Sequence, residues 1–155
     1  MATLADNVYE EITKLCSKGD LEAENGEYSK AITYYRQALE KVPDPKTDWE
    51  ASAWIYAALG DACWFMGDYE TAKDYFYDAY NCSDGANPFI LLRLGQALAE
   101  CDANEKAREF LLRAYVLMPE VFEGEDDKHY NIIKDLIENG AESKKGFFGR
   151  LFEKK

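Results

Sequence analysis

The sequence is poor in the residues from which most catalytic and metal sites are built. It has a single histidine, His129, and contains no glycine-rich phosphate loop, no G-x-S-x-G and no H-E-x-x-H motif. Its 30 carboxylates make chance pairs of acids easy to find, so such pairs do not indicate general acid-base chemistry. We therefore expect no enzymatic activity, no cofactor and no metal ion. We expect His129 to be a surface or helix-capping residue.

Long apolar runs are also absent. No stretch reaches the roughly 18 apolar residues that a membrane-spanning helix needs. The N-terminus, MATLADNVYEEITK, lacks the basic start and apolar core of a secretion signal. The four cysteines form no C-x-x-C pair, which favours buried free thiols over a disulfide framework or a zinc site. These features predict a cytoplasmic protein with reduced cysteines.

Positive charge is scarce, since the chain has 18 Lys and Arg residues and 30 Asp and Glu residues, which gives a net charge of -12. An acidic chain repels phosphate, so nucleic acid is not an expected partner. Apolar residues are plentiful, however, at 47% of the chain, and aromatic residues reach 14%. This composition indicates a packed core, and 155 residues suit one domain.

Three windows of the sequence repeat one pattern. Each is centred on a glycine, with a large apolar residue four positions before it. After the glycine come an alanine at twelve positions, a large apolar residue four further on and a second alanine three beyond that. The sets are Gly19, Ala31, Tyr35 and Ala38, then Gly60, Ala72, Phe76 and Ala79, then Gly95, Ala107, Leu111 and Ala114.

This pattern resembles the tetratricopeptide repeat, W-x-x-L-G-x-x-Y followed by A-x-x-x-F and then P. The best match is YAALGDACWFMGDYETAKDYFYDAY. The resemblance implies an all-α fold, a right-handed superhelical stack of helical hairpins, or α-solenoid. We expect the repeats over about residues 12-45, 53-86 and 88-121, within a domain of residues 1-140.

Helix-capping signals support these boundaries. Thr47 with Glu50 has the spacing of a capping box, and Asn87 before Pro88 has that of an N-cap followed by a proline in the first turn. A further apolar stripe, ending at Asn139-Gly140, predicts a seventh helix over about residues 126-138 that covers the last hairpin. The acidic residues just before it suit the positive end of that helix better than a metal ion.

The resemblance also implies a function, because the first helices of such hairpins line a concave surface. Ligand-facing positions of the family map here onto an aromatic floor with acidic margins. Trp54 and Trp64 are ten residues apart, about 80° around one helix, and are the expected exposed anchors. For Phe65, packing between helices is an equal alternative. The candidate partner-binding residues are Asp20, Trp54, Asp61, Trp64, Phe65, Phe89, Arg93 and Gln96.

We therefore expect a non-catalytic interaction module or adaptor that binds a peptide or helical segment with apolar and basic side chains. Repeats that clamp the C-terminal carboxylate of heat-shock chaperones have Lys and Asn where this chain has Cys16 and Asp20. Asp20 would repel a carboxylate, which disfavours a heat-shock co-chaperone. The alternative is a small acidic chaperone of a secreted or aggregation-prone partner, like type III secretion translocator chaperones, which share the three-repeat architecture.

The tail over residues 141-155 contrasts with the rest of the chain. From Ser143 onward it has five cations and one acid, which gives the tail a net charge of +4 and the body -16. Three interpretations remain open. The tail is a solvated end, or it docks into an acidic groove, its own or a neighbour's, or it anchors the chain to a membrane. The third is the least favoured, because two glycines make a marginal helix. The docking residues would be Phe147, Phe148, Arg150 and Phe152.

Overall fold

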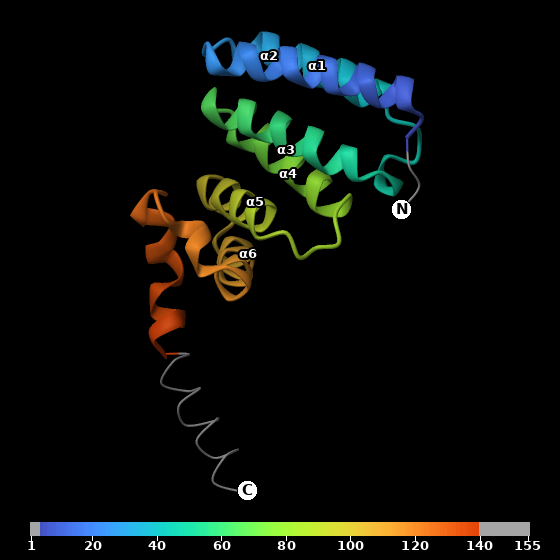
Figure 1. Cartoon of the computed structure of the whole chain (residues 1–155). Coiled ribbons are helices and arrows are strands. Elements are labelled where there is room, and N and C mark those ends of the chain that lie inside the picture. The colour runs from blue at the N-terminus through green and yellow to red at the C-terminus, as the bar shows by residue number, and fades with distance from the viewer. Residues whose placement is uncertain (1–3, 140–155) are drawn as a thin grey trace, which may run out of the picture.

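The computed structural model describes residues 4-139, so the tail and its four candidate docking residues lie outside the described part. Figure 1 shows helical hairpins stacked one on the next. They are formed by α1 (Asp6–Glu24) with α2 (Tyr28–Lys41), α3 (Glu50–Phe65) with α4 (Tyr69–Asn81), and α5 (Pro88–Glu100) with α6 (Asn104–Leu117). The described residues contain no strand. The predicted all-α solenoid is thus confirmed.

Each hairpin closes around the glycine of its repeat. A methyl group added to Gly60 would lie 2.6 Å from the ring of Phe76, and one added to Gly19 would lie 2.6 Å from the ring of Tyr35. In the third hairpin the corresponding distance, from Gly95 to the Leu111 side chain, is 2.7 Å. Since interiors are close-packed, no larger residue fits at these crossings without displacing its neighbour.

The turns inside the hairpins share one backbone conformation. Gly26 and Gly67 have φ angles of 75° and 80°, which glycine adopts without steric cost. The third hairpin has Asp102 at this position, and it adopts the same left-handed conformation at φ 60°. Aspartate is one of the few other residues that visit this region, so the third turn keeps its shape without glycine.

One of the two predicted caps forms. The Asn87 side-chain oxygen accepts hydrogen bonds from the backbone amides of Phe89, at 3.0 Å, and Ile90, at 3.2 Å. The prediction of a capping box at Thr47 and Glu50 is wrong, because Lys46–Asp48 forms the separate 3-10 turn η1 and α3 begins only at Glu50. Trp49 takes the N-cap position with an extended backbone and packs against the core of the first hairpin.

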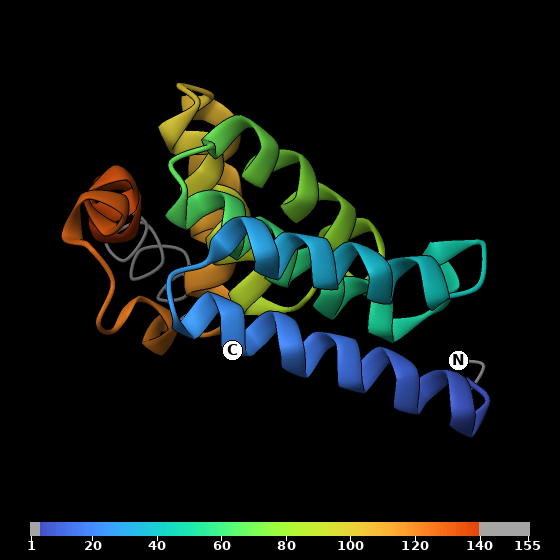
Figure 2. The same ribbon diagram turned by 90° about the horizontal axis from the view of Figure 1, so that it is seen from above.

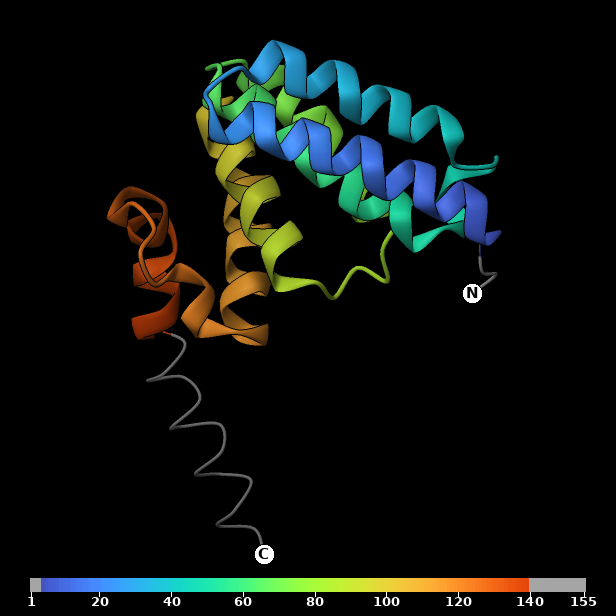
Figure 3. The ribbon, with the colours of Figure 1, turned by 45° about the horizontal axis from the view of Figure 1, so that its top comes forward.

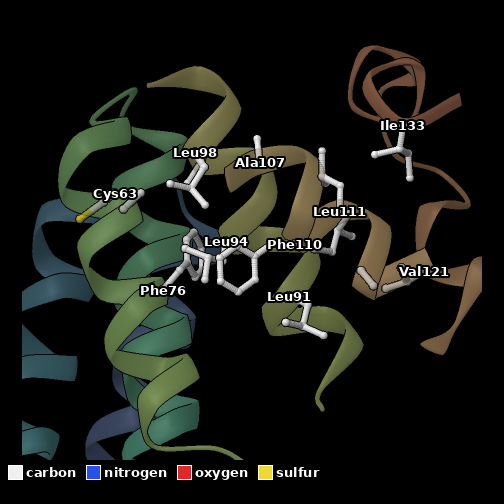
Figure 4. Packing of buried hydrophobic residues seen from close by; sticks show 14 residues of the cluster. Cys63, Phe76, Leu91, Leu94, Leu98, Ala107, Phe110, Leu111, Val121 and Ile133 are labelled. Carbon is white, nitrogen blue, oxygen red and sulfur yellow. The ribbon is translucent and has the colours of Figure 1, made fainter. Parts of the chain in front are cut away.

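The last hairpin is covered as expected. After the 3-10 turn η2 (Pro119–Phe122), residues 127-139 form a further helix, here called the terminal helix. Figures 2 and 3 show it beside the hairpin of α5 and α6. Its residue Ile133 is fully buried in the cluster that contains Leu111 and Val121 (Figure 4). The terminal helix thus removes the apolar face that the third hairpin would otherwise expose to water.

None of the helices in residues 4-139 is long and apolar enough to span a membrane. The four cysteines are free thiols, and burial raises the pKa of each. Raised pKa values keep these thiols protonated near neutral pH, which makes them poor nucleophiles.

Candidate functional site

Two neighbouring pockets lie along the first helices of the three hairpins. The larger, about 560 Å³, lies between α3, α5 and the start of the terminal helix. The smaller, about 330 Å³, lies between α1, α3 and the start of α2. Asp61 and Phe65 line both, so the pockets form one groove, and "the groove" below means their lining residues. The larger pocket is lined by Asp61, Trp64, Phe65, Tyr69, Arg93, Gln96, Glu125, Asp126, Lys128 and His129, and the smaller by Asp20, Ala23, Glu24, Tyr28, Tyr35, Ala58, Asp61, Ala62 and Phe65.

A line of polar contacts crosses the larger pocket. Arg93 Nε donates to Asp61 Oδ1 at 2.7 Å, and its Nη1 donates to Gln96 Oε1, also at 2.7 Å. The amide nitrogen of Gln96 in turn donates to Glu125 Oε2 at 2.9 Å. Four side chains from α3, α5 and the segment before the terminal helix are thereby joined, and the charge of Arg93 is balanced inside the groove.

Aromatic rings hold Arg93 in place. Its guanidinium carbon lies 4.8 Å from the centre of the Trp64 ring and 5.4 Å from that of Phe76. Such cation–π contacts orient the planar guanidinium as well as stabilising it. Burial raises the pKa of Asp61, Arg93 opposes this rise, and Glu125 adds to it.

The terminal helix supplies one wall of the larger pocket. Lys128 pairs with Glu100, and the hydrogen bond from Lys128 contributes most to holding the pKa of Glu100 below its usual range. His129 Nε2 lies 3.3 Å from Glu100 Oε1. The expectation that His129 is a surface residue is wrong. It is buried because the first turn of the terminal helix packs against Trp64, whose ring centre is 5.9 Å away.

Burial lowers the pKa of His129, and the hydrogen bond with Glu100 opposes this effect. The imidazole is therefore neutral near pH 7, and Glu100 accepts from the N–H at Nε2. Nδ1 then becomes an acceptor, and it has no hydrogen-bond partner within residues 4-139. The larger pocket thus has a buried acceptor in its wall.

A stacked aromatic pair lies where the two pockets meet. Phe65 stacks on Tyr28 with ring centres 5.6 Å apart and an interplanar angle of 18°. Phe65 remains 62% exposed, so it does not pack between helices. Trp64 meets Tyr69 edge to face at 4.8 Å. Tyr28 and Tyr69 follow Gly26 and Gly67 by two positions, and this recurrence was the sequence signal that could have placed both in the groove.

The charged side chains of the smaller pocket are all carboxylates. Asp20 Oδ1 accepts a 2.6 Å hydrogen bond from the hydroxyl of Tyr35, and burial together with this bond raises the pKa of that tyrosine. Asp20, Glu24 and Asp61 contribute three acids, and the lining of this pocket includes no Lys or Arg.

The structure brings six of the eight predicted residues together: Asp20, Asp61, Trp64, Phe65, Arg93 and Gln96 line the groove. Trp54 is 54% exposed and lines a separate pocket of about 310 Å³ near Glu50 and Asp84. Phe89 is 55% exposed and lines none of these three pockets.

The pairing of Trp54 with Trp64 as exposed anchors therefore needs correction. Their ten-residue separation places them about 15 Å apart along α3, however close they are in angle. Trp64 is also half-buried, since Arg93 and the terminal helix pack against it.

Four groove residues, Glu125, Asp126, Lys128 and His129, come from the segment after the last repeat. Asp126 does cap the terminal helix, since its carboxylate accepts from the Lys128 amide at 3.0 Å. Glu125 instead reaches Gln96, and no sequence pattern marks that contact. In residues 4-139 no group of three or more His, Cys, Asp or Glu side chains has the arrangement of a metal site.

Stacked hairpins closed at glycines, a terminal helix over the last of them and a groove along the first helices define a helical-repeat binding scaffold. More narrowly, the scaffold is that of tetratricopeptide-repeat proteins. The family model for the tetratricopeptide repeat matches residues 10-84, which cover the first two hairpins. No curated protein sequence matches the chain significantly.

Solved structures with the same fold come from organisms that are distant from one another. The second TPR domain of human RPAP3, in complex with the HSP70 peptide SGPTIEEVD, is 17% identical with a TM-score of 0.66, over 83% of this chain and 96% of that one. The Sgt2 TPR domain from Aspergillus fumigatus is 23% identical with a TM-score of 0.63, over 87% and 82%. The Yersinia enterocolitica type III secretion chaperone SycD, in complex with a peptide of the translocator YopD, is 16% identical with a TM-score of 0.65, over 90% and 99%. At these identities the likeness is one of fold.

Proposed function

We propose that this protein is a non-catalytic interaction module or adaptor whose groove binds a partner segment carrying apolar anchors together with Lys or Arg. The observation that carries the proposal is the exposed ring of Phe65, stacked at 5.6 Å on the half-buried Tyr28 and flanked by the carboxylates of Asp20, Glu24 and Asp61. Two of the similar solved structures, those of the RPAP3 domain and of SycD, are complexes with a peptide, which supports a peptide ligand for this fold.

The charge of the groove defines the polar part of the partner. Its lining has five carboxylates, Asp20, Glu24, Asp61, Glu125 and Asp126, against Arg93 and Lys128. Both cations are already paired, Arg93 with Asp61 and Lys128 with Glu100. A ligand cation therefore meets an excess of negative charge, whereas a ligand carboxylate is repelled. This is the opposite of what an acidic C-terminal peptide requires.

The apolar part of the partner is defined by the exposed rings. Phe65 offers a large, rigid surface that a buried anchor of the partner would cover, and aromatic residues are frequent at interface hot spots. Trp54 and Phe89, both exposed on the first helices of their hairpins, extend the contact surface for a longer partner segment. We assign them smaller contributions, because neither lines the groove.

The second candidate function is a chaperone that keeps an aggregation-prone partner soluble. It is favoured by the similarity to the Yersinia chaperone SycD, which extends over 90% of this chain. An adaptor and a chaperone would use the same groove but differ in outcome. A chaperone lowers the light scattering of its partner at stoichiometric ratio, and an adaptor does not.

The test uses affinity capture followed by measured affinities. The captured partner is reduced to its binding segment with overlapping peptides, and calorimetry compares the wild type with Phe65→Ala and Asp61→Asn. Tyr9→Ala is a matched control, because Tyr9 is 59% exposed, close to the 62% of Phe65, and lines none of the described pockets.

We expect Phe65→Ala to weaken binding at least about 10-fold, as for a hot-spot residue. Asp61→Asn should weaken it less and reduce its salt dependence, and Tyr9→Ala should leave it unchanged. Equal affinities for the wild type and Phe65→Ala would show that the partner binds elsewhere. A partner segment that proves acidic would contradict the charge assignment.

A further inference from the structure

We propose that the groove has an internal ligand, the chain's own basic aromatic segment over residues 144-155. This inference rests on the proposed function, since it uses the same groove and the same chemistry. It adds a regulatory property, because a partner would have to displace this segment in order to bind.

The charges of groove and segment are complementary. Residues 144-155 have five cations and one acid. In the groove Arg93 is neutralised by Asp61 and Lys128 by Glu100, which leaves Asp20 and Glu24 of the smaller pocket without a paired cation in residues 4-139. Attraction between opposite charges selects the orientation and speeds the encounter, and it weakens with salt.

The apolar groups also match. The segment offers Phe147, Phe148, Leu151 and Phe152, and the groove offers the exposed Phe65 with Tyr28 stacked beneath it. A phenylalanine placed on this pair would extend the aromatic stack and bury apolar surface on both sides. No other stretch of the sequence combines four large apolar residues with five cations in twelve positions.

The connection is long enough. His129 lines the groove, and the terminal helix continues for ten residues to 139, which is about 15 Å. Five residues of extended chain, 140-144, span up to about 17 Å and can bring the chain back to the level of His129. The remaining eleven residues can then extend up to about 36 Å along the groove. Attachment gives the segment a high effective concentration, of millimolar order, so even a weak contact would occupy the groove.

The experiment uses the full chain and a full-length variant, Phe147→Ser/Phe148→Ser/Phe152→Ser, which keeps the charge and length of the tail but removes its rings. The probe is a fluorescent peptide with the sequence of residues 143-155, SKKGFFGRLFEKK. Fluorescence anisotropy measures its affinity for both proteins. Phe65→Ala is added to the triple variant to alter the groove, and Tyr9→Ala is added to it separately as the control. Light scattering gives the mass of each protein.

We expect the triple variant to bind the peptide at least about 10-fold more tightly than the wild type, because its own tail no longer competes. Adding Phe65→Ala should abolish this gain, and adding Tyr9→Ala should not. The wild type should have the mass of a monomer. Equal binding by the wild type and the triple variant would overturn the proposal. A wild-type dimer that dissociates in the triple variant would also overturn it, because the tail would then occupy the groove of a second copy.

A second probe separates this inference from the proposed function. A thirteen-residue amphipathic Leu-Lys peptide has the same chemistry but not the sequence of the tail. If it binds the triple variant in a Phe65-dependent manner and the tail peptide does not bind, the internal ligand is excluded and the groove assignment stands. If neither peptide binds, both proposals fail. Salt-sensitive binding of the wild type to anionic vesicles, with no difference in peptide affinity, would assign the segment to a membrane surface instead.

Discussion

The guanidinium carbon of Arg93 lies 4.8 Å from the centre of the Trp64 ring. This contact explains why a tryptophan that lines the groove is not free to act as an anchor. The face of the indole is covered by a side chain of the next hairpin, and that side chain is directed toward Asp61 at 2.7 Å. Trp64 therefore positions polar groups of the groove, and the exposed ring is that of its neighbour Phe65.

Arg93→Lys should lower the free energy of unfolding by about 1 kcal/mol, a value reduced for the partial exposure of Asp61. Lysine keeps the charge but lacks the planar fork that serves Asp61 and Gln96 together and stacks on Trp64. Urea unfolding followed by tryptophan fluorescence measures the loss. Lys106→Arg, at an exposed surface ion pair, is the control and should be neutral. Equal stability of Arg93→Lys and wild type would show that the fork geometry is unimportant.

Gly60→Ala should destabilise the fold although alanine is the better helix former. The added methyl group would lie 2.6 Å from the fully buried Phe76 ring, and overpacking of this kind costs about 1–3 kcal/mol, against a gain in helix propensity of about 1 kcal/mol. The net loss of up to about 2 kcal/mol should lower Tm by up to roughly 8 °C. Adding Phe76→Leu should make Gly60→Ala less costly. If Gly60→Ala were as harmful in the Phe76→Leu background as alone, the crossing would not be its cause.

Stability should decline as pH falls below about 6.5, the usual pKa of histidine. Burial lowers the pKa of His129, so in this window the unfolded chain takes up a proton that the folded chain does not, and folding becomes less favourable. The loss is complete once pH drops below the pKa of the folded state. Thermal unfolding between pH 7.5 and 5.5 stays above the range in which carboxylates usually titrate. His129→Gln, which cannot titrate, should flatten the dependence, and an unchanged slope would assign it to other groups.

Ile133→Ala should cost about 2–5 kcal/mol, the range for emptying a fully buried isoleucine site. Ile132→Ala, one position earlier and only half-buried, is the matched comparison and should cost less. Because the terminal helix also supplies Lys128 and His129 to the groove, Ile133→Ala should weaken partner binding as well. Calorimetric unfolding and partner titration measure both effects. A variant that loses stability but keeps full affinity would show that partner binding does not depend on the packing of Ile133.

The scaffold could be predicted from the sequence because its determinants are local and recur. Glycine pairs with a large residue sixteen positions later in each repeat, and Gly19 with Tyr35 makes the same contact as Gly60 with Phe76. A constraint repeated three times in one chain is visible without coordinates. The cap at Asn87 was also predictable, since a cap involves only neighbouring residues.

The groove was less predictable, because its contacts join residues distant in sequence. Gln96 meets Glu125 and Glu100 meets His129, each across 29 positions, and neither pair belongs to a repeat. The same limitation explains why Trp64 was wrongly predicted to be exposed. Helical periodicity gives the angle at which a residue projects from its helix, but it does not show which side chains of the next hairpin pack against that residue. The burial of His129 depends on where the terminal helix packs, which its own sequence does not encode.

Asp61 and Phe65 belong to both pockets of the groove, so a ligand that bound in one half would contact residues that also line the other. A ligand cation that entered the smaller pocket and attracted Asp61 would compete with Arg93, which also donates to Gln96. Binding in one half would in this way change the affinity of the other half for its ligand, and thermodynamic linkage requires the effect to be reciprocal. For a partner that binds as proposed, the shared residues would also set a spacing rule. A partner with its cation and its apolar anchor in the wrong register would satisfy one half at the expense of the other.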